Sequence, residues 1–480
     1  MRYIYTKINK AITISLLIVM LVYVLLFNQV VNKVSSQEAS QKELELLWVK
    51  YGPEWWPAGT VHATCVSGTT VYVIGDSYFT VGVIEARDAN TGKLLDFWAK
   101  SYGSFTILYD CLILNDYLYV IGIDNYPGNW EWLILKLTLD LKLVAEKRYN
   151  PSPYEDAPYT IASDGKYLYV GGYDSSPMKA FGSIKDIWLF VDTQWHLIKM
   201  DPNDLSVIKS YTFNPSNNID KIYSINVNPI DGKIWIAGSV DLAKGRIEVL
   251  DENLSLISSL DLETFVAYPK IAFDEIGYSY LATVFSILKI SPELKIVKTN
   301  YYNITINKIT YNNGYLYLAG IICTENRLNN IIVKVTNELE ILDELVLNSQ
   351  NNATVFFADV GKMAITNNAL YVAGHLSTKK EFVWVIYAVR ISHLQNMTTT
   401  PIITNLTTPS QTSSSSIPTP ISLIPIPHNV TVNSNQTDTL TIPYSLIIPI
   451  SYSYIIFIVV TATFTAMIVI TLLILRKSKK

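Results

Sequence analysis

The sequence predicts an all-β fold: a seven-bladed β-propeller whose last blade is closed by an N-terminal strand. The prediction rests on a repeated sequence motif, a run of alternating apolar residues that ends in a small residue. Seven copies at a period of roughly 40–50 residues are the signature of a propeller. The clear copies are VYVIG at 71–75, LYVIG at 118–122, LYVGG at 168–172, IWIAG at 234–238, LYLAG at 316–320 and LYVAG at 370–374, with a weaker YSYLAT at 278–283.

A second run follows each copy and carries a polar residue at a fixed place. Period-two alternation in both runs predicts strands, and Asp-Gly or Asn-Gly pairs at 164–165, 231–232 and 313–314 predict the turns between them. No stretch of this region shows a helical period. The second runs read VGVIEARD, WLILKLT, HLIKMD, RIEVLD, SILKIS, IIVKVT and WVIYAVR.

An N-terminal stretch supplies the strand that the last blade lacks. Residues 44–51 (LELLWVKY) resemble the third stretch of other repeats, such as LLDFWAK at 94–100, whereas the last repeat ends near residue 391 without one. Propellers that close in this way leave no blade with an unpaired edge. The expected blade limits are 61–100, 105–149, 159–213, 222–262, 267–302, 306–347, and 354–392 completed by 44–51, within a propeller domain at 44–392.

Both chain ends predict membrane segments. Residues 1–36 have a basic flank followed by an uncharged run at 11–27, the layout of a signal peptide or a retained signal anchor, and cleavage is the favoured reading. The C-terminal segment 447–475 contains an uncharged run long enough to span a bilayer, and the basic tail 476–480 predicts a cytoplasmic C-terminus. The sequence therefore predicts a single-pass protein of the cell membrane with its propeller outside the cell.

Residues 393–442 form a Ser/Thr/Pro-rich segment that cannot bury enough apolar surface to fold and that we expect to be a glycosylated stalk. Asn-x-Ser/Thr acceptors are glycosylated only in an exported chain. Chance explains some of those in the propeller, whereas those in the tail are denser. The acceptors are Asn253, Asn303, Asn352, Asn396, Asn405, Asn429 and Asn435.

The cysteine content permits at most one intramolecular disulfide, because the chain holds three cysteines. Cys65 and Cys111 fall on the predicted innermost strands of neighbouring blades, so a bridge between them is conceivable. Two buried free thiols are the favoured interpretation.

The search for catalytic and cofactor motifs is negative. The five histidines have no metal-ligand spacing, and neither a nucleophile elbow nor a phosphate or dinucleotide loop is present, so no metal and no cofactor is expected. The formal net charge of −4 and the lack of a basic run in the central region disfavour nucleic acid as a partner.

Residues 86–98 read ARDANTGKLLDFW. They resemble the repeat of pyrroloquinoline-quinone-type propellers, with Asp88, Thr91, Gly92 and Lys93 matching a tight turn and two extra residues before the tryptophan. In that family the repeat is a packing device, and the cofactor site needs further residues, often adjacent cysteines, which this chain lacks. LYVGG at 168–172 likewise resembles a kelch repeat. These likenesses support the fold and imply no specific function.

The best candidate for a binding surface is a set of aromatic residues in loops. In a propeller, the loops between blades and the loops between middle strands lie on one face, and exposed aromatics there suit sugar or peptide recognition. The alternative is that the rings pack under their own loops. The candidates are Trp55, Trp56, Tyr78, Tyr126, Trp130, Tyr154 and Trp188.

The order of signal, propeller, stalk and C-terminal span resembles the layout of archaeal cell-surface proteins. That resemblance implies an external binding or scaffolding role toward an envelope protein, a glycan or a peptide. This hypothesis predicts an aromatic, glycan-free face and no buried polar cluster in the central channel. The alternative is an extracellular hydrolase with converging carboxylates at the channel rim, although the same residues suit turn capping. The candidates are Asp76, Asp124, Asp174, Asp241 and Glu325.

Overall fold

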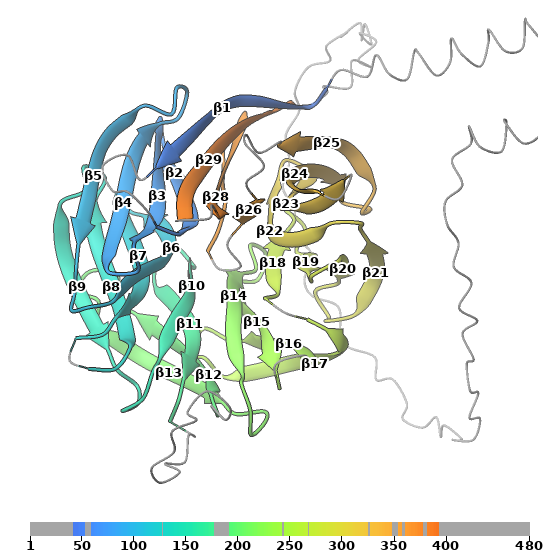
Figure 1. The fold of residues 1–480 in the computed structure, drawn as a ribbon. Coiled ribbons are helices and arrows are strands. Elements are labelled where there is room, and N and C mark those ends of the chain that lie inside the picture. Colours follow the sequence, from blue (N-terminus) through green and yellow to red (C-terminus); the bar gives the residue numbers. More distant parts are fainter. Residues whose placement is uncertain are drawn as a thin grey trace, which may run out of the picture. The chain divides into compact units, whose positions relative to one another are not determined.

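A computed structural model describes ten stretches of the chain. Every regular element within them is a β-strand, and the strands form seven sheets arranged around a central channel (Figure 1). This confirms the predicted seven-bladed propeller. The described residues are 42–52, 59–126, 128–176, 192–241, 244–266, 268–324, 327–347, 354–357, 361–377 and 382–392.

The predicted terminal segments 1–36, 393–442, 447–475 and 476–480 lie outside the described residues. Among the residues that are described, the structure holds no helix with the length and apolar character needed to cross a membrane.

The first three blades are four-stranded antiparallel sheets with the strands in chain order. Blade one holds β2 (Val61–Ser67), β3 (Thr70–Ser77), β4 (Val81–Asp88) and β5 (Leu94–Lys100). Blade two holds β6 (Thr106–Leu114), β7 (Tyr117–Asp124), β8 (Glu131–Thr138) and β9 (Leu143–Tyr149). Blade three holds β10 (Ala157–Ser163), β11 (Leu168–Asp174), β12 (Gln194–Met200) and β13 (Val207–Phe213).

The next three blades repeat this order. Blade four holds β14 (Lys221–Val227), β15 (Ile234–Val240), β16 (Lys244–Leu250) and β17 (Leu256–Phe265). Blade five holds β18 (Lys270–Phe273), β19 (Ser279–Ala282), β20 (Ser286–Ile290) and β21 (Ile296–Tyr301). Blade six holds β22 (Thr305–Asn312), β23 (Tyr315–Thr324), β24 (Arg327–Thr336) and β25 (Ile341–Leu347).

Blade seven combines the two ends of the propeller sequence. It holds β26 (Thr354–Phe357), β27 (Ala364–Ile365), β28 (Ala369–Ser377) and β29 (Phe382–Ile391), and its outermost strand is β1 (Leu44–Gly52). β1 runs antiparallel to β29 in a register from Leu44↔Ile391 to Gly52↔Trp384 (Figure 1). The predicted closure by an N-terminal strand is confirmed.

The antiparallel order gives the propeller two distinct faces. We call the face that carries the connections between blades and between second and third strands the loop face. The opposite face, which carries the first-to-second and third-to-fourth connections, is the turn face. Because β1 begins and β29 ends at positions equivalent to a third-to-fourth turn, the chain enters and leaves the propeller on the turn face.

The small residue that ends the repeated motif lies opposite a β-bulge in the first strand of its blade. In blade one the register shifts between Val61 and Ala63, and a Cβ added to Gly75 would lie 2.2 Å from the Thr60 carbonyl oxygen. The same bulge recurs in four further blades opposite Gly122, Gly172, Gly238 and Gly320. A bulge re-aims one side chain of its strand, and here that strand lines the channel.

The fixed polar residue of the second run joins neighbouring blades. Lys136 on β8 donates to the Asn203 carbonyl of blade three, and Lys199 on β12 donates to the Glu252 carbonyl of blade four. Lys334 on β24 extends the pattern to blade seven, where its ammonium binds the Glu43 carboxylate and the Ser392 carbonyl. The lysine at this polar position therefore links each of these blades to the next through its ammonium group.

Cys65 on β2 and Cys111 on β6 form a disulfide between blades one and two. The favoured interpretation of two free thiols was therefore wrong. The sequence placed both residues on adjacent innermost strands, but it carried no information on the side-chain directions that bring the two sulfurs together. The third cysteine, Cys323, is exposed and free.

Candidate functional site

A row of aromatic side chains, here called the aromatic strip, crosses the loop face over blades seven, one and two. It runs from Phe382 through Phe79 and Phe105 to Trp130, with ring centroids 6.5, 6.1 and 5.4 Å apart in that order. Phe382 and Phe79 are 38% and 36% exposed, and the other two are half-buried. The strip thus presents ring surface to solvent while being fixed by its own stacking.

Three of the predicted aromatic residues lie at or beside the strip. Trp130 belongs to it, Tyr78 precedes Phe79 in the β3–β4 loop, and Tyr126 stands in the β7–β8 loop with the Arg148 guanidinium 5.5 Å from its ring centre. Tyr78 and Tyr126 are 54% and 62% exposed, so neither ring packs under its own loop.

Tyr154 lies on the same face but is half-buried, and its main-chain groups bond with Asn129 and Ser152. Its loop therefore serves to join blades two and three. Trp55, Trp56 and Trp188 lie outside the described residues.

A second aromatic group, here called the channel ring, lines the loop-face end of the central channel. Its members come from five consecutive blades and contact one another in order, with centroid separations of 5.2, 5.5, 5.3 and 4.9 Å. They are His62, Tyr109, Tyr159, Tyr223 and Tyr268.

Sequence reasoning missed the channel ring, although a signal was present. The bulge side chain stands thirteen residues ahead of the repeat glycine in four blades. The pairs are His62 with Gly75, Tyr109 with Gly122, Tyr159 with Gly172 and Asn307 with Gly320. The spacing alone does not say where these side chains point, because it is the bulge in the strand that directs them toward the channel.

The strip and the ring share one apolar base. Phe105, Trp130, Tyr109 and Tyr159 all pack on a buried cluster that includes Tyr173. Burial and the neighbouring tyrosines raise the pKa values of Tyr109 and Tyr173 well above the usual range, so both phenols stay protonated at physiological pH. The base that the strip and the channel ring share is thus uncharged.

Buried charged residues line the channel beyond the ring, contrary to the expectation of no polar cluster there. Asp110 is fully buried, Lys308 is 1% exposed and Lys270 is 8% exposed. Asp110 and Lys308 directly follow the bulge residues Tyr109 and Asn307, and Lys270 begins β18 two residues after Tyr268.

The predicted rim carboxylates are held within their own blades. The main-chain N–H groups of Phe79, Tyr126 and Ser176 donate to Asp76, Asp124 and Asp174 over 2.8, 2.9 and 2.9 Å. Each of these residues is at most 1% exposed, and its carboxylate has a second partner, namely Thr60, Arg148 and His196 in that order. These three aspartates therefore cap their loops, the structural alternative that the sequence left open.

Asp241 differs from the other three. It lies beyond the end of β15 with a φ of 53° and is exposed, and Asn218 donates to it over 3.0 Å. Asp241 follows the last residue of β15, whereas Asp76, Asp124 and Asp174 lie within their strands. Asp220 caps this loop instead, accepting the Asp241 N–H over 2.8 Å. Glu325 lies outside the described residues.

Two of the predicted glycosylation acceptors are described, and both are exposed. Asn253 lies in the β16–β17 turn on the turn face, whereas Asn303 lies in the β21–β22 connection on the loop face. Asn303 belongs to the junction of blades five and six, while the aromatic strip covers blades seven, one and two. Asn352, Asn396, Asn405, Asn429 and Asn435 lie outside the described residues.

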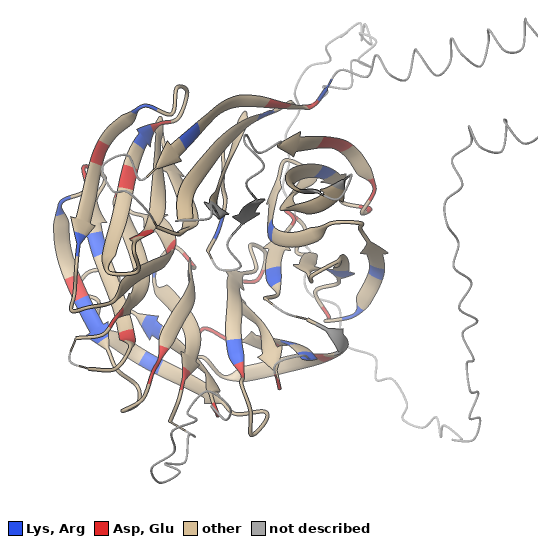
Figure 2. Cartoon of the chain, viewed as in Figure 1, with Lys and Arg blue, Asp and Glu red and all other residues tan. Residues whose placement is uncertain are grey.

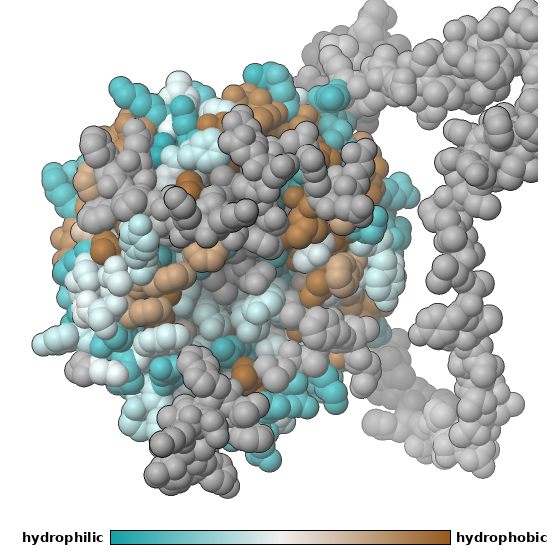
Figure 3. Space-filling model, in the orientation of Figure 1, coloured by the Kyte–Doolittle hydropathy of each residue, from teal (hydrophilic) through white to brown (hydrophobic). Residues whose placement is uncertain are grey.

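Figure 2 shows acidic and basic residues scattered over the blades of the propeller. The face seen in Figure 3 carries apolar residues in several separate patches with polar residues between them. Among the described residues, no three His, Cys, Asp or Glu side chains are grouped so that they could hold a metal ion.

A buried glutamate beside the strip makes stability depend on pH. Burial and the Asp124 carboxylate raise the pKa of Glu131 to about 7, against the opposing effect of Arg148. This folded-state pKa lies above the ordinary value of 4.5, so the stabilisation is complete below that value and is lost as the pH rises through 7. We expect the free energy of unfolding to fall by about 1 kcal/mol between pH 6 and 8 from this group.

Urea titrations of the parent and of Glu131→Gln at pH 6, 7 and 8 measure this effect. Glutamine cannot ionise, so the variant should lose less stability over this range than the parent, and Glu340→Gln, at an exposed position, should follow the parent. Parallel pH profiles for Glu131→Gln and the parent would contradict the prediction.

No protein-family model matches the chain, and no curated protein sequence matches it. Among solved structures it is similar to the Neurospora crassa Pan2 WD40 domain, with a TM-score of 0.48 and 9% identity over 73% of this chain and 96% of that one. It is also similar to BamB from Moraxella catarrhalis, with a TM-score of 0.41 and 12% identity over 72% of this chain and 100% of that one. A protein of unknown function from Bacteroides caccae has a TM-score of 0.34 and 13% identity over 50% of this chain and 78% of its own. These likenesses concern the fold alone.

Proposed function

We propose that this chain is a membrane-anchored, extracellular binding module whose partner, an envelope glycan or protein segment, docks on the aromatic strip. The observation that carries the proposal is the continuous row of ring contacts from Phe382 through Phe79 and Phe105 to Trp130 across three blades, with Phe382 and Phe79 exposed and the other two rings half-buried. Exposed rings in a fixed array are the groups that dominate binding energy at recognition surfaces.

The chain enters and leaves the propeller away from the aromatic strip. Both Glu43 and Ser392 lie at the turn-face end of blade seven, where the Ser392 N–H donates to the Glu43 carbonyl over 2.8 Å. The aromatic strip lies on the opposite, loop face of the propeller.

The disulfide between Cys65 and Cys111 supports the proposed location as well, because such bonds persist mainly in exported proteins. The exposure of Asn253 and Asn303 is also compatible with glycosylation outside the cell.

Glycan and peptide arrays probed with the labelled full-length chain in detergent solution test the proposal. We expect the parent to bind a defined set of spots and Phe79→Ala/Trp130→Ala to bind them at least about thirtyfold more weakly, because removing even one aromatic anchor costs about 2 kcal/mol. Phe97→Ala is the matched control, since Phe97 is 42% exposed on the outer strand β5 and lies away from the strip.

An unchanged binding pattern in the folded double variant would overturn the strip as the site. Failure of the parent to bind any spot would favour a purely structural role in the envelope.

A further inference from the structure

A cavity of about 300 Å³ lies in the central channel, on the turn-face side of the channel ring. The innermost strands of blades four, five and six, β14, β18 and β22, form most of its wall. Its lining becomes more exposed toward the turn face: Ser224 and Ile271 are buried, Thr310 and Tyr311 are half-buried, and Pro229 is exposed. The cavity is therefore open at the turn face, and its volume lies at the lower end of those that ligand sites occupy.

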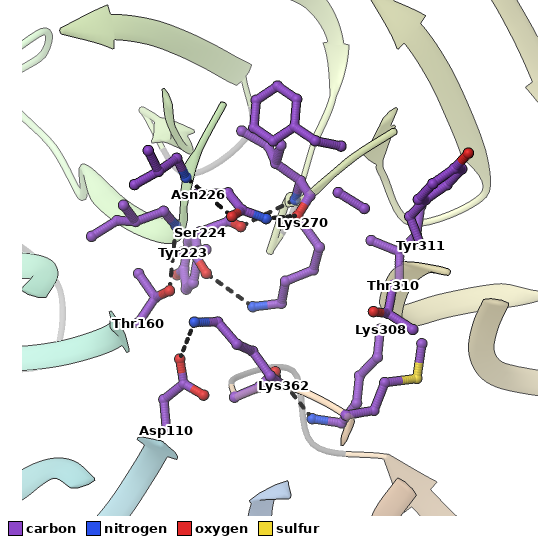
Figure 4. Close-up of a pocket in the computed structure, with 18 of the residues that line it drawn as sticks. Asp110, Thr160, Tyr223, Ser224, Asn226, Lys270, Lys308, Thr310, Tyr311 and Lys362 are labelled. Atoms are coloured by element: carbon purple, nitrogen blue, oxygen red, sulfur yellow. Dashed lines mark hydrogen bonds and ion pairs between the residues drawn. The ribbon is translucent and has the colours of Figure 1, made fainter. Parts of the chain in front are cut away.

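Two buried hydroxyl groups line the inner part of the cavity. Thr160 and Ser224 are 3% and 6% exposed, and Figure 4 shows both side chains on the side of the cavity opposite Tyr311. Thr160 Oγ1 accepts the Ile225 N–H over 3.3 Å, and Ser224 Oγ accepts the Ile271 N–H over 3.1 Å. Because each hydroxyl acts as an acceptor in these contacts, each still has a proton to donate. An acceptor atom of a ligand in the cavity would satisfy these buried donors.

The charged side chains of the lining are bonded within the protein. Lys270 donates to the Tyr223 carbonyl over 3.0 Å, and the Lys362 ammonium lies 3.5 Å from the Asp110 carboxylate (Figure 4). Lys308 likewise donates to main-chain carbonyls. A charged ligand would have to lose its hydration and displace such contacts, which is unfavourable inside a protein. The lining therefore favours an uncharged ligand.

Two isoleucines border the mouth of the cavity. Ile230 directly follows the lining residue Pro229 in the β14–β15 turn, and Ile276 lies in the β18–β19 turn. The two turns touch, since a Cβ added to Gly277 would lie 3.3 Å from Ile230 Cγ1. At 63% and 65% exposed, they are the two most exposed isoleucines among the residues that the structure describes. Turns are usually built from polar residues and glycine, so these side chains suit contact with an apolar group at the mouth.

Two aromatic rings continue this apolar surface into the cavity. Phe273 ends β18 and Tyr311 belongs to β22, and both line the cavity. Phe273 packs edge-on against Trp235 with ring centroids 5.4 Å apart, and Tyr311 stacks on Tyr280 with centroids 6.2 Å apart. Because these contacts hold both rings in place, their surface is organised before a ligand enters. An organic ring is the kind of group that packs against such side chains.

We propose that this cavity binds an uncharged small organic molecule that carries a hydrogen-bond acceptor on an apolar ring. The acceptor binds the hydroxyls of Thr160 and Ser224, and the ring packs against Phe273 and Tyr311 on the side of the mouth. The site is independent of the function proposed above, because it shares no residue with the aromatic strip. A variant that has lost the strip should therefore keep its affinity for such a ligand.

Saturation-transfer NMR titrations of the full chain in detergent micelles, with benzamide and separately with benzoate, test the proposal. The two probes have nearly the same shape, but benzamide is uncharged and benzoate is an anion. We expect the parent to bind benzamide about tenfold more tightly than benzoate, because the carboxylate must lose its hydration on entering the cavity. Titrations of empty micelles correct for the probe that the detergent takes up.

Three variants locate the bound probe. Ser224→Ala removes one donor and should weaken benzamide binding about threefold to tenfold. Ile276→Ser alters an exposed turn residue, so it should fold as the parent does and weaken benzamide binding about threefold through the loss of apolar surface at the mouth. Ile208→Ser is the matched control, because Ile208 is 51% exposed on the outer strand β13, away from the cavity, and should leave the affinity unchanged.

Benzamide binding by the parent no stronger than by empty micelles would mean that the cavity holds only solvent, and it would overturn the proposal. Equal or tighter binding of benzoate would refute the assignment of an uncharged ligand. Should Ser224→Ala fail to fold, Ile276→Ser decides between the cavity and another site. An affinity for benzamide that Ile276→Ser and Ile208→Ser leave equally unchanged would contradict binding at this mouth.

Discussion

Replacing Glu43 with glutamine is expected to lower the free energy of unfolding by about 3 kcal/mol, because it leaves a buried ammonium group without its counter-charge. The Lys334 side chain is fully buried, and its ammonium binds the Glu43 carboxylate and, over 2.8 Å, the Ser392 carbonyl. One lysine of blade six thus holds the residues at which the chain enters and leaves blade seven.

Urea denaturation followed by far-ultraviolet circular dichroism measures the effect. Glu45→Gln is the matched control, because Glu45 lies two residues away in an ion pair with Arg390 whose side chains are 58% and 54% exposed. Exposed pairs of this kind contribute about 0–1 kcal/mol. In Glu43→Gln/Lys334→Met, which removes both charges, much of the lost stability should return. Equal losses in Glu43→Gln and Glu45→Gln would refute the role assigned to Lys334.

Replacing Trp195 with alanine should destabilise the propeller by about 3–5 kcal/mol, the usual cost of deleting a large buried aromatic ring. Trp195 on β12 is fully buried, and its indole N–H donates to the Ser239 carbonyl of blade four over 2.9 Å. The ring covers Gly238, where an added Cβ would lie 2.6 Å from its Cζ2 atom. Trp132 and Trp384 make the same indole contact with the next blade, to Tyr173 and Asp76.

The same denaturation experiment with Trp195→Phe separates packing from hydrogen bonding. Phenylalanine keeps most of the buried surface and loses the indole donor, so we expect a smaller loss, of about 1–2 kcal/mol. If Trp195→Ala cost less than about 1 kcal/mol, packing of this ring between blades three and four would not be a main source of stability.

The number and limits of the blades could be predicted because every blade repeats the same main-chain pattern. A motif such as LYVIG at 118–122 predicts a buried second strand. The strand observed at this place, β7, spans Tyr117–Asp124. The closure was predictable for the same reason, since residues 44–51 carry the pattern of a fourth strand. Local patterns sufficed wherever the fold repeats.

Contacts between blades could not be predicted, because they depend on side-chain directions that no single repeat contains. The sequence showed Cys65 and Cys111 on neighbouring strands but not the bond between them. It showed the lysine of IIVKVT but not its partner Glu43, which lies 291 positions away along the chain. The channel ring was hidden for a similar reason, since its direction follows from the bulge at residues such as Tyr109.

The candidate site was predicted in part. Aromatic loops were expected on one face, and Tyr78, Tyr126 and Trp130 are there with ring surface exposed or stacked. Phe105 and Phe382, which make the strip continuous, were not among the predicted residues: Phe105 directly precedes β6 and Phe382 is the first residue of β29. Continuity across blades is a property of the closed ring.

The side-by-side entry and exit of the chain also determines how the propeller would respond to a pulling force. Leu44 pairs with Ile391 at the very end of the β1–β29 ladder. Tension between the chain leading into β1 and the chain leaving β29 would therefore peel the two strands apart one pair at a time, as a zipper opens, instead of loading all pairs together in shear. The contact between Lys334 and Glu43 lies beside the first of these residue pairs and would be the first to break.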